Sequence, residues 1–159
     1  MPVDIQSPSL CIGIVGTGAM GRGIAQIAAQ AGIRVLLFDA LHGAAANARD
    51  TVNGTLARLA DKGKISAEAL AAASSRLEVV ARLDELASAQ VIIEAIVENL
   101  DVKKSLFQQL EDIIAADCIL ATNTSSLSVT SIAAACKRPE RIGGFHFFNP
   151  VPLMKIVEV

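Results

Sequence analysis

The sequence predicts an α/β protein whose mainly parallel, doubly wound sheet is covered by helices on both faces. Two observations support this fold class. Short apolar runs rich in β-branched residues alternate with helical stretches, and the first run ends in a glycine turn that opens a helix. The composition agrees, because hydrophobic residues form 52% of the 159-residue chain while Trp and Tyr are absent, which suits aliphatic packing. The length fits one domain.

The first elements form the beginning of a βαβ unit. "CIGIVG" (11–16) is apolar and stops at glycines, which is typical of a buried strand. "AMGRGIAQIAAQAG" (19–32) carries a helical apolar face and ends at Gly32. "RVLLFD" (34–39) predicts a second buried strand that ends in an acid.

The remaining elements continue the alternation. Two helical stretches, at about 43–62 and 66–75, predict a helical hairpin hinged at Gly63. The clearest later helix is "DVKKSLFQQLEDII" (101–114). Further strands are expected at 77–80, 91–96, 118–123, 141–148 and, after the Pro150/Pro152 turn, in "LMKIVEV" (153–159).

Several function classes are disfavoured. A net charge of −2 gives no electrostatic reason to expect a nucleic-acid partner, and no apolar run approaches the length that spans a bilayer. "MPVDIQSPSL" lacks the pattern of a signal peptide. Cys11, Cys118 and Cys136 are too widely spaced to suggest a disulfide framework or a metal site. We therefore expect a cytoplasmic protein without a metal.

The turn "GTGAMG" has the G-x-G-x-x-G spacing of a dinucleotide-binding loop. Gly16 permits the tight turn, Gly18 lets the backbone approach a pyrophosphate, and Gly21 lets the helix pack closely. Ala19 and Met20 lie at the helix N-terminus, whose free N–H groups attract phosphates. A plain structural turn is the alternative, but a strand precedes the motif and a helix follows it, as the fingerprint requires.

Asp39 ends the second strand, 18 residues after Gly21. A carboxylate there accepts hydrogen bonds from a ribose 2′-hydroxyl and repels a 2′-phosphate, so NAD is favoured over NADP. The alternative is a solvated acid at a strand end.

Three further strand ends carry polar clusters, in "AIVEN", "TNTSSL" and "HFFNP". Ligands sit at these ends in open α/β sheets. Residues 123–126 and 98–99 also suit helix starts, with Lys103 on a solvated face. His146 is either a satisfied core residue or a base, and the second reading requires "LMKIVEV" to fold back and bring Glu158 to the ring.

Together, "GIVGTGAMGRGIAQIAAQAG", "AIVENLDVKKSLF", "ATNTSSLSV" and "GFHFFNPVPLMKIVEV" resemble the NAD-binding domain of the 3-hydroxyacyl-CoA dehydrogenases of fatty acid metabolism. The resemblance runs from about residue 10 to 159. It implies that His146 is the base for the substrate's 3-hydroxyl and Glu158 its partner. It also implies that Ser125 bonds the substrate oxygen and that Asn149 contacts the nicotinamide end of NAD.

The resemblance also implies contacts with the cofactor at Glu98 and Lys103, and contacts with coenzyme A at Thr55 and Lys62 of the hairpin. Residues 1–159 would be the NAD-binding domain, with a protruding helical hairpin inserted at about 43–75. The family continues into an all-helical domain that this sequence does not contain. We therefore expect self-association or a helical partner, which would cover apolar residues around "PVPLM".

Two alternative functions remain open. One is a dehydrogenase for a free hydroxy acid, of the gulonate or 3-hydroxyisobutyrate type, which the hairpin and "HFFNPVP" disfavour. The other is a non-catalytic module that binds NAD or coenzyme A. The missing helical domain favours this module, whereas the presence of Ser125, His146 and Glu158 disfavours it.

Overall fold

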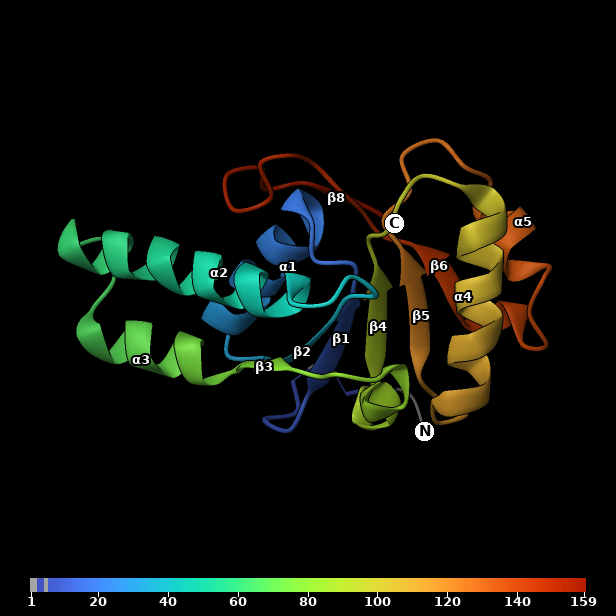
Figure 1. Ribbon diagram of the computed structural model, residues 1–159, viewed down its shortest axis with the longest axis horizontal. Helices are drawn as coiled ribbons and strands as arrows, with labels where there is room; N and C mark the ends of the chain where they lie inside the picture. Colours follow the sequence, from blue (N-terminus) through green and yellow to red (C-terminus); the bar gives the residue numbers. More distant parts are fainter. Residues whose placement is uncertain (1–2, 5) are drawn as a thin grey trace.

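A computed structural model describes residues 3, 4 and 6–159 and confirms the α/β class (Figure 1). Its centre is a six-stranded parallel sheet in the order β3-β2-β1-β4-β5-β6. The strands are β1 (Cys11–Val15), β2 (Arg34–Phe38), β3 (Leu77–Val79), β4 (Val91–Glu94), β5 (Ile119–Thr122) and β6 (Ile142–Gly144). This is the strand order of the doubly wound dinucleotide-binding fold, and its topological switch point lies between β1 and β4.

Helices cover both faces of the sheet, as predicted. The helices are α1 (Ala19–Gln30), α2 (Ala44–Asp61), α3 (Ala67–Ser75), α4 (Leu100–Ile113) and α5 (Val129–Ala133), with short 3₁₀ helices η1 (Leu83–Ser88) and η2 (Pro139–Arg141). One apolar cluster joins the sheet to α1, α2 and α3, and a second joins it to η1, α4 and α5. Successive residues of β2 alternate between the clusters, since Val35 and Leu37 enter the first and Leu36 the second.

The predicted hairpin is present, and the tips of α2 and α3 project away from the sheet (Figure 1). Gly63 follows α2 with φ +66°, a left-handed conformation that glycine adopts without strain. Ser66 caps α3 by accepting a hydrogen bond of 3.1 Å from the Ala69 N–H. Among the described residues, no helix is both long enough and apolar enough to cross a membrane.

The prediction of one continuous strand over 141–148 was wrong. β6 belongs to the parallel sheet, whereas β7 (His146–Phe147) pairs antiparallel with β8 (Val157–Glu158). Beyond the break, the Phe147 N–H donates to the side chain of Asn123, at 2.9 Å from Oδ1. Within the predicted strand 153–159, only Val157 and Glu158 are extended and paired.

Candidate functional site: a bipartite cavity at the carboxyl ends of the strands

Two adjoining cavities lie at the carboxyl ends of the strands, where the fold places ligands. The larger, of about 910 Å³, is lined by the glycine turn, the end of β2 and the exposed start of α4. The smaller, of about 350 Å³, is lined by the ends of β5 and β7 and by the 146–149 segment. Both include Ala95 and Ile96, which follow β4. The two cavities therefore meet at this point.

The glycine turn has the geometry that phosphate binding needs. Gly16 adopts φ +91°, and a Cβ there would lie 2.6 Å from the Ala95 carbonyl oxygen. A Cβ on Gly21 would collide with the Gly16 carbonyl oxygen. A Cβ on Gly18 would meet nothing within 4 Å, so this glycine borders open space at the N-terminus of α1. The turn thus exposes backbone to a ligand at Gly18 and requires glycine for packing at the other two positions.

Asp39 holds the glycine turn through hydrogen bonds that the sequence did not suggest. Its Oδ2 accepts hydrogen bonds from the Thr17 N–H at 2.8 Å and the Thr17 hydroxyl at 2.7 Å, while Oδ1 accepts one from the Leu41 N–H at 2.9 Å. Burial alone would raise the pKa of Asp39, but these donors outweigh it and hold the pKa below its ordinary value. The acid therefore fixes the glycine turn and keeps a negative charge beside the larger cavity.

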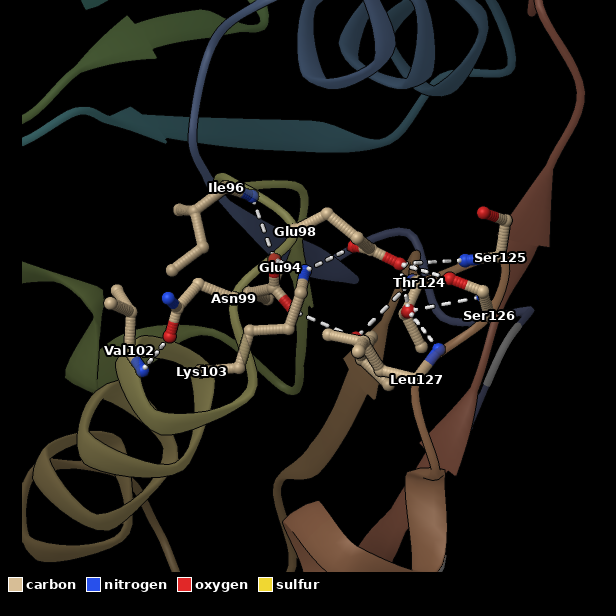
Figure 2. A network of polar contacts seen from close by, with 11 residues as sticks. Glu94, Ile96, Glu98, Asn99, Val102, Lys103, Thr124, Ser125, Ser126 and Leu127 are labelled. Carbon is tan, nitrogen blue, oxygen red and sulfur yellow. Dashed lines mark hydrogen bonds and ion pairs between the residues drawn. The ribbon is translucent and has the colours of Figure 1, made fainter.

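A buried charge network lies at the end of β4 (Figure 2). Glu94 is fully buried, and its Oε1 accepts from Lys103 Nζ at 2.6 Å and from the Ile96 N–H at 2.7 Å. The Thr122 hydroxyl donates to Glu94 Oε2 at 2.7 Å. Lys103 is only 1% exposed, so its interpretation as a solvated residue is wrong. Its ammonium also lies 3.3 Å from Glu98 Oε2.

Glu98 connects this network to the serine-rich loop after β5. Its Oε1 accepts hydrogen bonds from the Thr124 hydroxyl, from the Ser125 N–H at 3.3 Å and from the Ser126 hydroxyl at 3.4 Å. Burial would raise the pKa of Glu98, but the Thr124 hydroxyl, the Lys103 charge and the Ser125 N–H lower it overall. An ionised carboxylate thus holds the loop that carries Ser125.

The helix that follows β5 is not capped by the residues that the sequence suggested. Residues 123–126 do not cap α5, whose N-cap is Ser128, accepting from the Ser131 N–H at 3.1 Å. Asn99 does cap α4, accepting from the Val102 N–H at 3.1 Å. The Ser125 hydroxyl has no hydrogen-bond partner among the described residues and lines the smaller cavity. It is available to a ligand.

His146 and Glu158 meet as the second of the two interpretations requires. The β7–β8 register places the residues opposite one another, and His146 Nδ1 lies 2.8 Å from Glu158 Oε2. The His146 side chain is 24% exposed and lines the smaller cavity with Ser125 and Asn149. With Nδ1 on the carboxylate, the neutral ring has Nε2 free to accept a proton. His146 is therefore not a satisfied core histidine.

Comparison with known proteins decides the family. Residues 11–159 match the NAD binding domain of 3-hydroxyacyl-CoA dehydrogenase. The chain belongs to this family. It is 43% identical to the 3-hydroxyadipyl-CoA dehydrogenase of Escherichia coli over 100% of the chain and 33% of that protein. It is also 43% identical to a 3-hydroxybutyryl-CoA dehydrogenase of Bradyrhizobium diazoefficiens, covering 93% of the chain and 50% of that protein.

Solved structures of the family share the fold. A 3-hydroxybutyryl-CoA dehydrogenase from Escherichia coli superimposes with a TM-score of 0.91 at 44% identity, covering 94% of this chain and 32% of that one. The (S)-3-hydroxybutyryl-CoA dehydrogenase of Ralstonia eutropha gives 0.89 at 40% identity, covering 92% and 52%. The chain thus spans a third to about half of these family members, and it corresponds to their NAD-binding part.

The family's expected coenzyme A positions lie on the hairpin. Thr55 lines a third cavity, of about 170 Å³, together with Arg22, Asn149 and Pro150. Its hydroxyl donates to the Thr51 carbonyl at 3.1 Å and accepts from Arg58. Lys62 is exposed at the end of α2. The two positions lie outside the two main cavities, and Asn149 connects the third cavity to the smaller one.

The apolar residues near "PVPLM" divide into two groups. Val151 is buried and packs on α1, where a Cβ on Gly23 would lie 2.9 Å from the Val151 Cβ. Exposed apolar side chains follow it: Leu153 (75%), Met154 (41%), Ile156 (56%), Val157 (40%) and Val159 (93%). Apolar side chains are therefore exposed beyond residue 152, as expected, whereas Val151 is covered by α1.

Sequence reasoning missed the roles of three residues that support the site. Thr17 orients Asp39, Asn123 holds β7 through the Phe147 N–H, and Glu94 buries the Lys103 charge. Glu94 carried a usable signal, because it ends an apolar strand with an acid in the same way as "RVLLFD" does. Asn123 stood in the polar cluster after β5 but was expected only as a possible helix cap, and Thr17 lies inside the glycine turn without a signal of its own.

Proposed function

We propose that this chain supplies the NAD site and the acid–base pair for oxidation of a 3-hydroxyacyl-CoA to the 3-oxoacyl-CoA. The observation that carries the proposal is the His146–Glu158 pair at 2.8 Å, which borders the same cavity as Ser125. A base with an orienting carboxylate, beside a free hydroxyl donor, suits removal of a proton from an alcohol. Bound NAD supplies the hydride acceptor.

Each residue of the pair has a defined task. His146 accepts the proton of the substrate's 3-hydroxyl at Nε2, because Nδ1 is held by Glu158. Glu158 fixes the tautomer and stabilises the imidazolium that forms. Ser125 donates its free hydroxyl to the substrate oxygen.

The residues present fit NAD. The open space at Gly18 and the N-terminus of α1 suit the pyrophosphate, and Asp39 at the end of β2 suits the adenosine ribose. Glu98, Lys103 and Asn149 line the smaller cavity and suit the nicotinamide half, with Met20 beside them. Ala19 contributes its backbone at the first helical position.

The hairpin is proposed to bind coenzyme A. Lys62 is exposed and makes no ion pair with the described residues, so its ammonium is available to a phosphate. Thr55 borders the cavity that reaches Asn149. This arrangement supports an acyl-CoA over a free hydroxy acid, which needs no contact outside the cavity that holds His146.

We further propose that the exposed apolar side chains between Leu153 and Val159 are covered by a helical domain or by a second copy. Size-exclusion chromatography and hydrophobic-dye binding test this proposal. A monomer at high concentration that binds no extra dye would count against it.

NADH oxidation that depends on acetoacetyl-CoA tests the proposed reaction. The chain is assayed alone and with an added helical domain from a relative, and free 3-hydroxyisobutyrate and gulonate serve as competing substrates with NAD. Turnover of only the free acids would favour the alternative dehydrogenase. NADH binding without any turnover, even with the helical domain, would favour a non-catalytic module.

A further inference from the structure

Glu94 has no assigned task in the proposed reaction, yet it is a fully buried acid beside the cofactor site. All three of its partners act as donors: the Ile96 N–H, the Lys103 ammonium and the Thr122 hydroxyl, which itself accepts from the Thr124 N–H. A carboxyl that only accepts hydrogen bonds is the ionised form. A buried charge is costly unless it is paired, and here Lys103 pairs it.

The network contains more negative than positive charge. Lys103 lies 2.6 Å from Glu94 and 3.3 Å from Glu98, so one ammonium serves two carboxylates and a net charge of −1 remains. Glu98 is the carboxylate that lines the smaller cavity, and its side chain is 42% exposed. Among the residues that line this cavity in the described chain, the other ionisable side chains are Lys103 and His146.

We infer that Glu94 tunes the site toward oxidised NAD, because its charge offsets that of Lys103 and leaves the network of Glu94, Lys103 and Glu98 with a net charge of −1 beside the cavity. The nicotinamide ring is cationic in NAD⁺ and neutral in NADH, so a net negative cavity binds the oxidised form better. The inference rests on the proposed placement of the nicotinamide in the smaller cavity. Glu94 is a positioning residue, since it acts through Lys103 and Glu98.

Calorimetric titration of the parent chain and of Glu94→Gln with NAD⁺, NADH and ADP-ribose tests this inference. With Glu94 neutral, Lys103 neutralises Glu98, and the ratio of the NAD⁺ to the NADH dissociation constant should rise roughly three- to tenfold. The ADP-ribose affinity should stay within about twofold, because that ligand has no nicotinamide. A purely structural role for Glu94 would instead weaken all three ligands alike, and that result overturns the inference.

Two further variants keep the test decisive. Glu94→Gln/Lys103→Met removes both buried charges and restores a net charge of −1, so its NAD⁺/NADH ratio should return toward the parent value whatever its absolute affinity. Glu111→Gln makes the same change in another buried carboxylate, 3% exposed and paired with Arg141, and should leave the ratio unchanged. If the double variant keeps the ratio of Glu94→Gln, the charge argument fails.

The proposed placement is tested separately in the parent chain. If NAD⁺, NADH and ADP-ribose bind equally, the nicotinamide does not occupy the smaller cavity, and both the placement and the inference are overturned. If the parent distinguishes NAD⁺ from NADH and Glu94→Gln does so equally, the placement stands and only the role of Glu94 is overturned.

Discussion

Removing the charge of Asp39 without removing its hydrogen-bonding atoms should relax the choice between NAD and NADP. Asp39→Asn keeps one oxygen acceptor for the donors of Thr17 and Leu41, so the glycine turn retains part of its support. Asp39→Ala should also erode the preference. It additionally frees all three donors, each worth about 0.5–3 kcal/mol, and so confounds selectivity with loop stability.

The size of the effect follows from the charge that Asp39 presents to the larger cavity. Its Oδ1 has the Leu41 N–H as its hydrogen-bond partner, which leaves acceptor capacity for a ribose hydroxyl. Two unit charges about 5 Å apart at an effective dielectric constant of about 40 repel by about 1.7 kcal/mol, and a doubly charged phosphate by about twice that. After allowance for solvent screening, a preference for NADH of roughly 30- to 150-fold is expected in the parent.

Titration of NADH and NADPH by the change in their fluorescence measures this preference. Asp39→Asn should reduce it to below about fivefold, mainly through tighter NADPH binding, because the repulsion disappears. Asp50→Asn is the matched control, since Asp50 lies exposed on α2 and its loss changes the net charge by the same amount. Equal affinity of the unmodified chain for both cofactors would refute the assignment of Asp39.

Three further outcomes are expected. Gly18→Val should abolish NADH binding with an unchanged far-UV circular dichroism spectrum, because its Cβ projects into open space. Gly21→Ala should instead disturb the fold itself. A global loss of structure in Gly18→Val would favour a plain structural turn over a cofactor-binding loop. In an active assembly, His146→Gln and Glu158→Gln should each lower kcat, and the double variant should lower it little more than the worse single variant. Additive losses of activation free energy would argue that the two residues do not act as a pair. Burial raises the pKa of Glu111, but the N–H groups of Lys137 and Arg138 and the Arg141 charge lower it overall. Its contribution to stability is therefore complete above its ordinary pKa and is lost as the pH falls through the lowered pKa of the folded state. Melting temperatures should therefore fall between about pH 5 and pH 3, less steeply in Glu111→Gln.

The central sheet was predictable because its signals are local. A buried parallel strand reads as a short apolar run, and the glycine spacing fixes the first turn regardless of the rest of the chain. β7 and β8 were not predictable as separate strands, since two-residue strands leave no periodic pattern. β7 is also held by a long-range contact, because its Phe147 N–H donates to Asn123, which lies 24 residues earlier in the chain.

The site was predictable in so far as its residues end strands. His146 and Glu158 follow from a strand end and a proline-bracketed turn, which together allow the chain to fold back. The burial of Lys103 carried a local signal, because it lies four and seven residues before Phe107 and Leu110 on the buried face of α4, but its charge partner was not predictable from that helix. That partner is Glu94 from a different element, and such pairing is visible only once strand and helix are packed together.

The three acids at this edge of the sheet, Asp39, Glu94 and Glu98, make different kinds of contact because their surroundings differ. Asp39 has backbone donors on both oxygens and stays partly exposed, so it can hold the turn and still receive a ribose hydroxyl. Glu94 is fully enclosed with each oxygen accepting, so it has no capacity for a ligand and acts on its neighbours alone. Glu98 is intermediate, because its Oε1 accepts hydrogen bonds from the loop after β5 while its Oε2 pairs with Lys103, which also pairs with Glu94, beside the cavity. Exposure and free acceptor capacity, rather than the residue type, therefore determine which of these acids can contact a cofactor.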